Sequence, residues 1–278
     1  MPTAGQSSPP DEQQLIAAAR AGDRRAFDSL VAPHVPSLRT FIYRLVCQPD
    51  DAADVAQDTL LTAFQKIAGF RGEASFRTWL FSIGTRKGLD LLRKRKRWPL
   101  DAQSRGEQRT LGDPEMKGTV DATIEQPEFV YEYRQHVAYC LSCVGRTLPP
   151  EQSAALLLKE LLLFESRDAA KVLDMSESTF RHRLTAARVT MREGFEGLCA
   201  LVGKQGVCYQ CNKLRDYCPP DKRGRKVEPI ADESLDPDEK LTRRLAVVRQ
   251  VPLDVGDSRV HDLLLRYMSE LWDRTPSV

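Results

Sequence analysis

Apolar residues recur along most of the chain at spacings of three and four, which is the period of an amphipathic helix. In the first hundred residues such stripes begin near Leu15, Leu38 and Phe76. No stretch of useful length alternates apolar and polar residues as a half-buried strand does. The pattern therefore predicts an all-α fold, with a first helical unit over 11–98 after a disordered polar segment, 1–10.

Helical periodicity weakens over 99–127, where polar residues, glycine and proline dominate, so this interval is expected to be a flexible linker. The period resumes in a second small unit over 128–202. The remaining interval, 203–278, is a short extension that contains two further amphipathic stretches, at 236–251 and 258–273. These two helices are too short to bury a core of their own, so we expect them to pack on the rest of the chain.

A helix-turn-helix is predicted inside the second unit, from residue 166 onward. Its turn carries Asp174, a residue that tolerates the left-handed backbone conformation for which such turns usually use glycine. Ser176 is suited to cap the second helix. That helix presents side chains able to contact phosphates and base edges: Ser176, Ser178, Thr179, Arg181, His182, Arg183 and Arg188.

Charge is concentrated locally although the formal net charge is only +2. Seven lysines and arginines but a single acid lie between Arg86 and Arg97, at the end of a helix that Ser75 can cap. Such a helix is suited to hold a nucleic-acid backbone, the alternative being a solvated charge run. Phe76 and Trp79 either stack on bases or, as their helical spacing favours, belong to the core.

Catalysis and membrane insertion are not expected. The four histidines are scattered, and no nucleophile motif is present, so an enzyme is disfavoured. The longest apolar stretch, 154–164, is interrupted by Lys159 and Glu160 and is too short to span a bilayer. The N-terminus does not resemble a signal peptide, so a cytoplasmic location without a membrane partner is expected.

Taken in order, four segments resemble the extracytoplasmic-function group of sigma-70 family sigma factors of bacterial RNA polymerase. They are Ala21-Gly22-Asp23 with Phe27, the acidic segment 51–58, the run 70–80, and Thr147-Leu148-Pro149-Pro150 before the helix-turn-helix. The resemblance implies that 11–98 is sigma region 2 and 128–202 is sigma region 4. It implies core RNA polymerase and promoter DNA as partners, and a separate anti-sigma factor as a further one.

The resemblance also assigns roles to residues. The acidic helix would dock on the polymerase through Asp51, Asp54, Gln57 and Asp58; the three aspartates share one helix face, and a merely solvated face is the alternative. The segment after it would bind and melt the minus-ten element through Phe70, Arg71, Ser75, Arg77, Arg86, Arg93, Arg95 and Arg97. The helix-turn-helix would read the minus-thirty-five element.

Seven cysteines in a reducing compartment indicate metal binding, redox sensing or burial rather than disulfides. One possibility is that two C-x2-C pairs, Cys140 with Cys143 and Cys208 with Cys211, together form a tetrahedral site; Cys218 lies close to the second pair in the sequence. The other possibility is that His136, Cys140 and Cys143, which share a helical stripe, bind one ion. Zinc is the one cofactor that these spacings suggest, and none is required. We expect the extension to act as a regulatory lid that responds to metal or thiol chemistry.

Two other functions fit parts of the sequence. A stand-alone helix-turn-helix regulator explains the second unit but leaves the acidic helix and the basic helix without a role. A metal or thiol sensor built on a sigma-like scaffold explains the cysteines.

Overall fold

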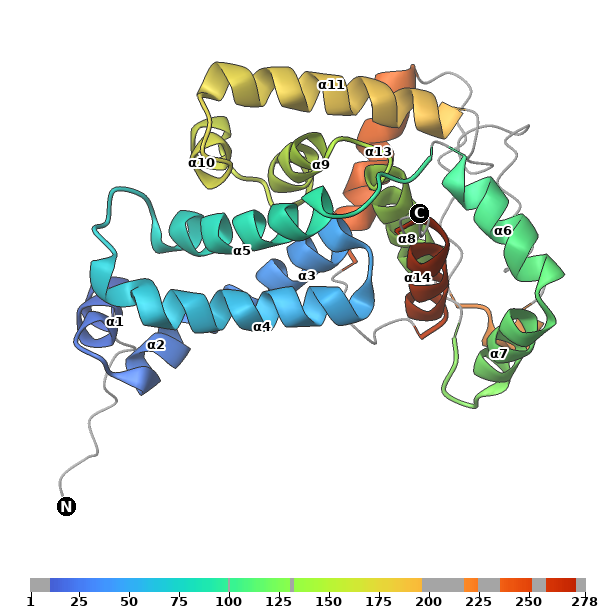
Figure 1. The fold of residues 1–278 in the computed structure, drawn as a ribbon, viewed down its shortest axis with the longest axis horizontal. Helices are drawn as coiled ribbons and strands as arrows, with labels where there is room; N and C mark the ends of the chain where they lie inside the picture. Colours follow the sequence, from blue (N-terminus) through green and yellow to red (C-terminus); the bar gives the residue numbers. More distant parts are fainter. Residues whose placement is uncertain are drawn as a thin grey trace.

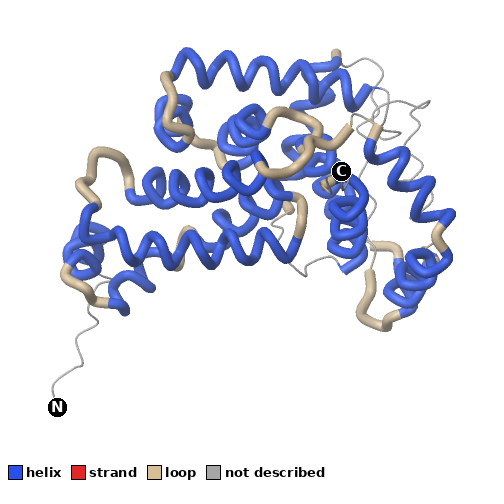
Figure 2. The backbone as a smooth tube through the Cα atoms, in the orientation of Figure 1, coloured by secondary structure: helices blue, strands red, loops and turns tan. Residues whose placement is uncertain are grey.

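The structure is a computed structural model of the whole chain, and it describes residues 11–99, 101–130, 133–196, 218–224, 236–251 and 259–273. Helices joined by loops and turns make up these ranges, and no strand is drawn in them (Figure 2). The prediction of an all-α fold is confirmed.

The first module is built from five α-helices and a short 3-10 turn, η1. They are α1 (Glu12–Arg20), α2 (Arg24–Val31), α3 (Val35–Val46), α4 (Pro49–Lys66), η1 (Ile67–Gly69) and α5 (Phe76–Arg93). Asp23 caps α2, because its carboxylate accepts the backbone N–H groups of Arg25 at 2.8 Å and Ala26 at 3.1 Å. Helices α3, α4 and α5 pack on one another around fully buried residues such as Leu38 and Phe81 (Figure 1).

The second module comprises α8 (Tyr133–Gly145), α9 (Pro150–Leu156), a π-helical turn η2 (Leu157–Leu161), α10 (Ser166–Val172) and α11 (Glu177–Glu196). Helices α10 and α11 form the predicted helix-turn-helix around the buried ring of Phe180. Asp174 in the turn has φ 53°, which is the left-handed conformation that the sequence predicts. The second module lies against the first, since α9 and α10 contact α5.

The left-handed conformation of Asp174 gives a test of this turn. Asp174→Val is expected to lower the free energy of unfolding by about 1–2 kcal/mol, because a β-branched residue is strained at positive φ. Asp174→Gly is the matched control, because glycine also lacks the carboxylate but adopts a positive φ without strain. Its expected change in the free energy of unfolding is within about 0.5 kcal/mol. Urea unfolding measures both, and equal losses would contradict the assignment.

The interval 99–127 differs from its prediction. Instead of a flexible linker, it forms α6 (Ala102–Gly112) and α7 (Pro114–Glu125). Asp113 starts α7 by accepting the N–H groups of Glu115 and Met116, each at 3.1 Å, and proline occupies the first helical position. These helices have few apolar residues, and the C-terminal extension supplies the surface against which they pack (Figure 1).

The extension forms the two predicted helices, α13 (Pro237–Arg249) and α14 (Arg259–Trp272), and a 3-10 turn, η3 (Pro220–Lys222). As expected, both α-helices pack on the rest of the chain: α13 on α8 and α11, and α14 on α4, α6, α7 and α8. Arg44 of α3 is buried and donates to the main-chain oxygens of Val248 at 3.2 Å and Val251 at 2.5 Å. Burial lowers the pKa of Arg44 to about 10.

Candidate functional site

The acidic face of α4 is mainly open to solvent. Asp54, Gln57 and Asp58 are exposed, and Asp58 keeps 68% of its side-chain surface accessible although a lysine of α5 lies 3.7 Å away. Asp51 differs, because its carboxylate pairs with the Arg95 guanidinium at 2.5 Å and is largely covered. Three of the four predicted polymerase contacts can therefore meet a partner, and the fourth is engaged within the chain.

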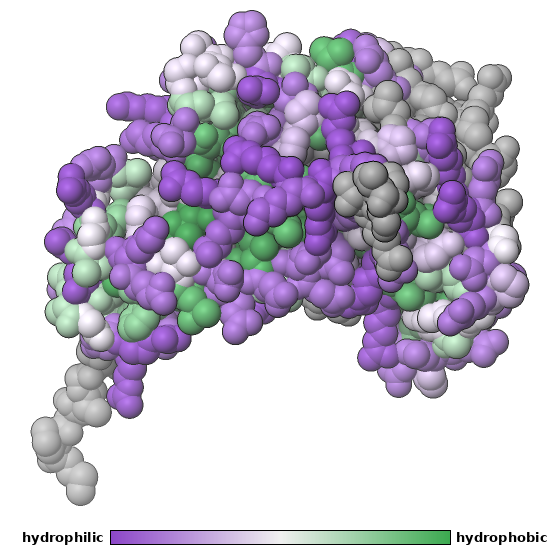
Figure 3. All heavy atoms as spheres, viewed as in Figure 1, coloured by the Kyte–Doolittle hydropathy of each residue, from purple (hydrophilic) through white to green (hydrophobic). Residues whose placement is uncertain are grey.

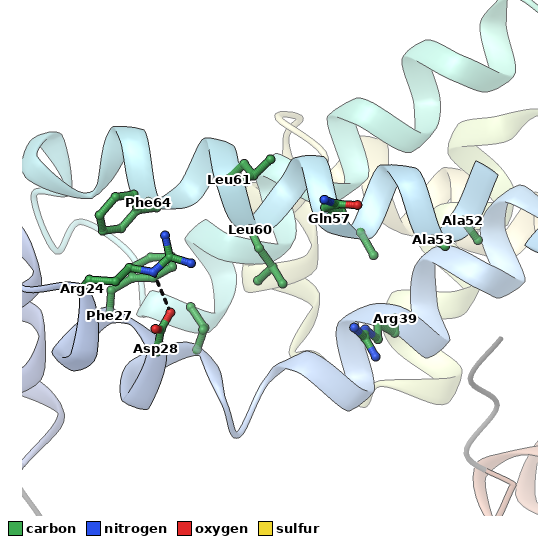
Figure 4. Close-up of a pocket in the computed structure, with 12 residues that line it drawn as sticks. Arg24, Phe27, Asp28, Arg39, Ala52, Ala53, Gln57, Leu60, Leu61 and Phe64 are labelled. Carbon is green, nitrogen blue, oxygen red and sulfur yellow. Dashed lines mark hydrogen bonds and ion pairs between the residues drawn. The ribbon is translucent and has the colours of Figure 1, made fainter. Parts of the chain in front are cut away.

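An apolar groove of about 480 Å³ runs beside this face, between α4 and the pair α2–α3 (Figure 4). Phe27, Leu60 and Phe64 supply its apolar lining, and three alanines of α4 keep it open. An ion pair between Arg24 and Asp28, at 3.0 Å, stands at one end. Figure 3 shows apolar surface over α4 and α5 within a mainly hydrophilic face. An apolar groove within a mainly hydrophilic surface is typical of a protein-binding site.

The loop before α5 is held by its ends. The Ser75 hydroxyl accepts the N–H of Thr78 at 3.1 Å, which confirms the predicted helix cap. Phe70 at the other end is buried, with its ring centroid 5.9 Å from Phe76 and 5.2 Å from Trp79. The Phe70 ring thus packs in the core in this arrangement, and its role as a DNA contact stays a prediction.

A cavity of about 370 Å³ lies between this loop and α10. Arg71, Thr78 and Trp79 line it from the first module, and Lys171 lines it from the helix-turn-helix. The Lys171 ammonium donates to the main-chain oxygen of Glu73 at 3.3 Å. Phe76 is fully buried whereas Trp79 is half-buried, so the core assignment holds for Phe76 and only partly for Trp79.

Several arginines predicted to bind DNA contact groups outside the first module. The Arg77 guanidinium donates to the main-chain oxygen of Leu162 at 2.8 Å and lies 3.9 Å from the ring centroid of Phe164. Arg86 pairs with Asp174 at 3.8 Å on the exposed surface. Both contacts join α5 to the second module.

The last turn of α5 and the residues after it continue this pattern. Arg93 pairs with Glu151 of α9 at 3.1 Å, and Arg95 pairs with Asp273 at the end of α14, also at 3.1 Å. Arg97 is exposed. Three of the seven basic residues between Arg86 and Arg97 thus pair with acids from later parts of the chain.

The second helix of the helix-turn-helix presents its polar face outward. The Ser176 hydroxyl caps α11 by accepting the N–H of Thr179 at 3.2 Å, as predicted. Arg181 pairs with Glu177 at 2.6 Å yet keeps 70% of its side chain exposed. Of the predicted contacts, Arg183 is half-buried and the others are exposed: Ser176, Ser178, Thr179, Arg181, His182 and Arg188.

The predicted metal or thiol residues do not form a metal site in the described part of the chain. His136, Cys140 and Cys143 are buried in α8, with His136 Nε2 3.6 Å from the Cys140 sulfur and Nδ1 facing His261 Nε2 at 3.1 Å. No three His, Cys, Asp or Glu side chains among the described residues are arranged to hold one ion. Cys218 is buried, and Cys208 and Cys211 lie outside the described residues.

Comparisons with known proteins match both modules. Residues 30–97 match the family model of Sigma-70 region 2, and residues 140–191 match that of Sigma-70, region 4. The RNA polymerase sigma-H factor of Pseudomonas aeruginosa is 30% identical over 189 residues, covering 67% of this chain and 95% of that protein. The chain belongs to the extracytoplasmic-function sigma factors of the sigma-70 family.

Other sigma factors show the same likeness. RNA polymerase sigma factor CnrH of Cupriavidus metallidurans is 31% identical over 187 residues. The match covers 66% of this sigma factor and 94% of CnrH. The solved structure of CnrH in complex with the cytosolic domain of CnrY is 24% identical, with a TM-score of 0.48, and covers 66% of this chain and 97% of that chain. The two family models and the sequence relatives confirm the resemblance stated from the sequence.

The relatives therefore account for about two thirds of this sigma factor. As a member of the family it acts in transcription initiation, with core RNA polymerase and promoter DNA as partners. No helix in the described ranges combines the length and the apolar character needed to cross a membrane.

The burial of His261 is expected to make the stability of the sigma factor depend on pH. Burial lowers the pKa of His261 well below its ordinary value, and the neighbouring His136 acts in the same direction. Because the folded pKa is depressed, the stabilisation is complete above the unfolded value of about 6.5 and is lost as the pH falls below it. We expect a loss of about 1 kcal/mol between pH 6.5 and 5.5, measured by urea unfolding.

His261→Gln is the control for this pH dependence, because glutamine can hydrogen-bond to His136 without titrating. Its unfolding free energy is expected to fall less steeply over the same interval. Identical slopes for the variant and the wild-type protein would show that other groups carry the dependence.

Proposed function

We propose that this sigma factor works in the cytoplasm, without catalytic activity of its own, and that each module supplies one binding face. The face of α4 that carries Asp54, Gln57 and Asp58, together with the adjoining groove, binds core polymerase. The loop 70–75 and the basic face of α5 bind the minus-ten element. The exposed face of α11 binds the minus-thirty-five element.

One observation supports this assignment most strongly. Asp54, Gln57 and Asp58 remain solvent-exposed beside an apolar groove in the module that matches Sigma-70 region 2. Carboxylates around an apolar groove provide both steering and burial for a basic partner. A stand-alone helix-turn-helix regulator would leave this surface without a role.

The test is reconstituted transcription. The full-length protein is mixed with core polymerase and fragmented genomic DNA, and the start sites of the transcripts are sequenced. New starts that share two upstream elements are expected only when both proteins are present. DNA binding of equal strength and specificity without core polymerase would favour the regulator instead.

Two further expectations stay predictions. Zinc or thiol modulation would have to involve residues such as Cys208 and Cys211, because the described residues hold no suitable group of ligands. Binding of a separate anti-sigma factor is the second of these predictions.

A further inference from the structure

Helix α14 contacts both sigma modules and the helices between them. Its apolar face is buried through Val260, Leu264, Leu265 and Met268. Packing partners come from α4 in the first module, from α6 and α7, and from α8 in the second module (Figure 1).

Against the first module, α14 uses polar groups as well as apolar ones. The Tyr43 hydroxyl donates a hydrogen bond to the buried carboxylate of Asp262, with 2.6 Å between the two oxygens. Arg266 forms two hydrogen bonds with the carboxylate of Asp50, each 2.9 Å long. Asp50 immediately precedes the acidic face of α4, so α14 lies beside the proposed polymerase site.

Asp273, just after α14, connects the two modules directly. Its carboxylate accepts hydrogen bonds from Trp98 Nε1 at 2.8 Å and from Arg146 at 2.7 Å, and it pairs with Arg95 at 3.1 Å. Arg146 belongs to the second-module side and is only 3% exposed. Arg95 also pairs with Asp51. The Asp273 carboxylate therefore holds Arg95, a proposed DNA contact, next to Asp51, a proposed polymerase contact.

The helices between the modules are held by the same element. Gly106 of α6 is buried against α14 so closely that a Cβ atom there would overlap the sulfur of Met268. The Tyr267 hydroxyl lies 3.3 Å from the carboxylate of Asp113 at the start of α7. Among the described residues, α14 thus packs on a helix of each module, α4 and α8, and on both helices between the modules.

We propose that α14 is an intramolecular clasp that holds the two modules against each other, and that its displacement frees Asp51 beside the open part of the polymerase-binding face together with the arginines of the DNA-binding face. This inference rests on the proposed function of those faces. In the closed arrangement Arg77, Arg86 and Arg93 contact the second module, and Arg95 contacts Asp273 after α14. Lys171 of the second module donates to the main chain of the loop before α5. A protein that must open before it binds has an apparent affinity reduced by the fraction of open molecules.

Two variants of the full chain weaken the clasp by different means. Gly106→Leu places a side chain where α14 leaves no room for a Cβ atom, and its matched control is Gly118→Leu, at an exposed position of α7 with open space around it. Asp273→Asn removes the charge that Arg95 and the buried Arg146 face, which leaves Arg146 without its ion-pair partner.

Small-angle X-ray scattering and binding of core polymerase are then measured on the same samples. Both variants are expected to expand and to bind core polymerase at least about fivefold more tightly than the wild-type protein and Gly118→Leu. Expansion without any gain in affinity overturns the clasp, and so does unchanged scattering in both variants. If no protein binds polymerase, the proposed function fails, whereas scattering still decides whether α14 holds the modules together.

Discussion

Replacing Asp54 and Asp58 by arginine is expected to weaken binding of core RNA polymerase by about 100-fold. Both carboxylates are exposed and one helical turn apart on α4, so a basic partner meets them together. Reversing both charges turns attraction into like-charge repulsion, which costs several kcal/mol at an interface, and about 1.4 kcal/mol corresponds to a factor of ten. The fold is unaffected, because the weak ion pair of Asp58 is mostly solvated.

The measurement is the dissociation constant with labelled core polymerase at two salt concentrations. Glu128→Arg with Glu193→Arg is the control, since it makes the same change in net charge at exposed carboxylates outside α4. Asn substitutions at Asp54 and Asp58 are expected to give an intermediate affinity. A double variant that binds as tightly as the control would remove α4 from the interface.

Phe76→Ala is expected to have the largest effect on stability, a loss of about 3–5 kcal/mol in the free energy of unfolding. The Phe76 side chain is fully buried, and its ring centroid lies 5.8 Å from that of His34, 5.9 Å from Phe70 and 5.6 Å from Trp79. Truncation leaves a cavity among these rings and loosens the start of α5, which positions the loop.

Trp79→Ala is the comparison for Phe76→Ala, because the indole is half-buried and lines the loop cavity. We expect a smaller loss of stability and a larger loss of promoter opening at matched folded concentration. Urea unfolding and permanganate footprinting of promoter DNA measure the two effects. Equal stability losses would mean that Trp79 is as much a core residue as Phe76.

The elements that the sequence predicts well are those fixed by local chemistry. Ser75 and Ser176 cap the helices that they precede, because a cap depends on neighbours within three residues. Asp174 adopts the left-handed turn for a similarly local reason. The amphipathic extension helices followed from apolar period alone.

What the sequence did not reveal depends on residues far apart in the chain. Helices α6 and α7 carry few apolar residues, and their packing surface on α14 lies more than a hundred residues later. The acceptor of Arg77 is a main-chain oxygen, which has no signature in the sequence. The groove beside α4 has one trace in the sequence, the adjacent pair Leu60 and Leu61, because two neighbouring residues of a helix cannot both lie at the centre of its buried face. In the structure Leu61 is 46% exposed.

The surroundings of the predicted metal residues also depend on distant parts of the chain, and zinc binding itself stays a prediction. The spacing of His136 and Cys140 correctly placed both on one face of α8, and their atoms are 3.6 Å apart. That face turns into the core, where His261 of the extension takes the other nitrogen of His136. Spacing along a helix fixes which residues are neighbours but not what the face meets.

Arg44 has a consequence for synthesis on the ribosome. This guanidinium belongs to the first module, yet its main-chain acceptors, Val248 and Val251, lie 204 and 207 residues later in the chain. At about 5–20 residues per second, residues 203–278 take on the order of 4–15 s to translate once residue 202 has been added. During most of that interval the nascent chain contains the sequence of both modules but not the acceptors of Arg44, so this buried guanidinium must stay solvated until the extension has been made.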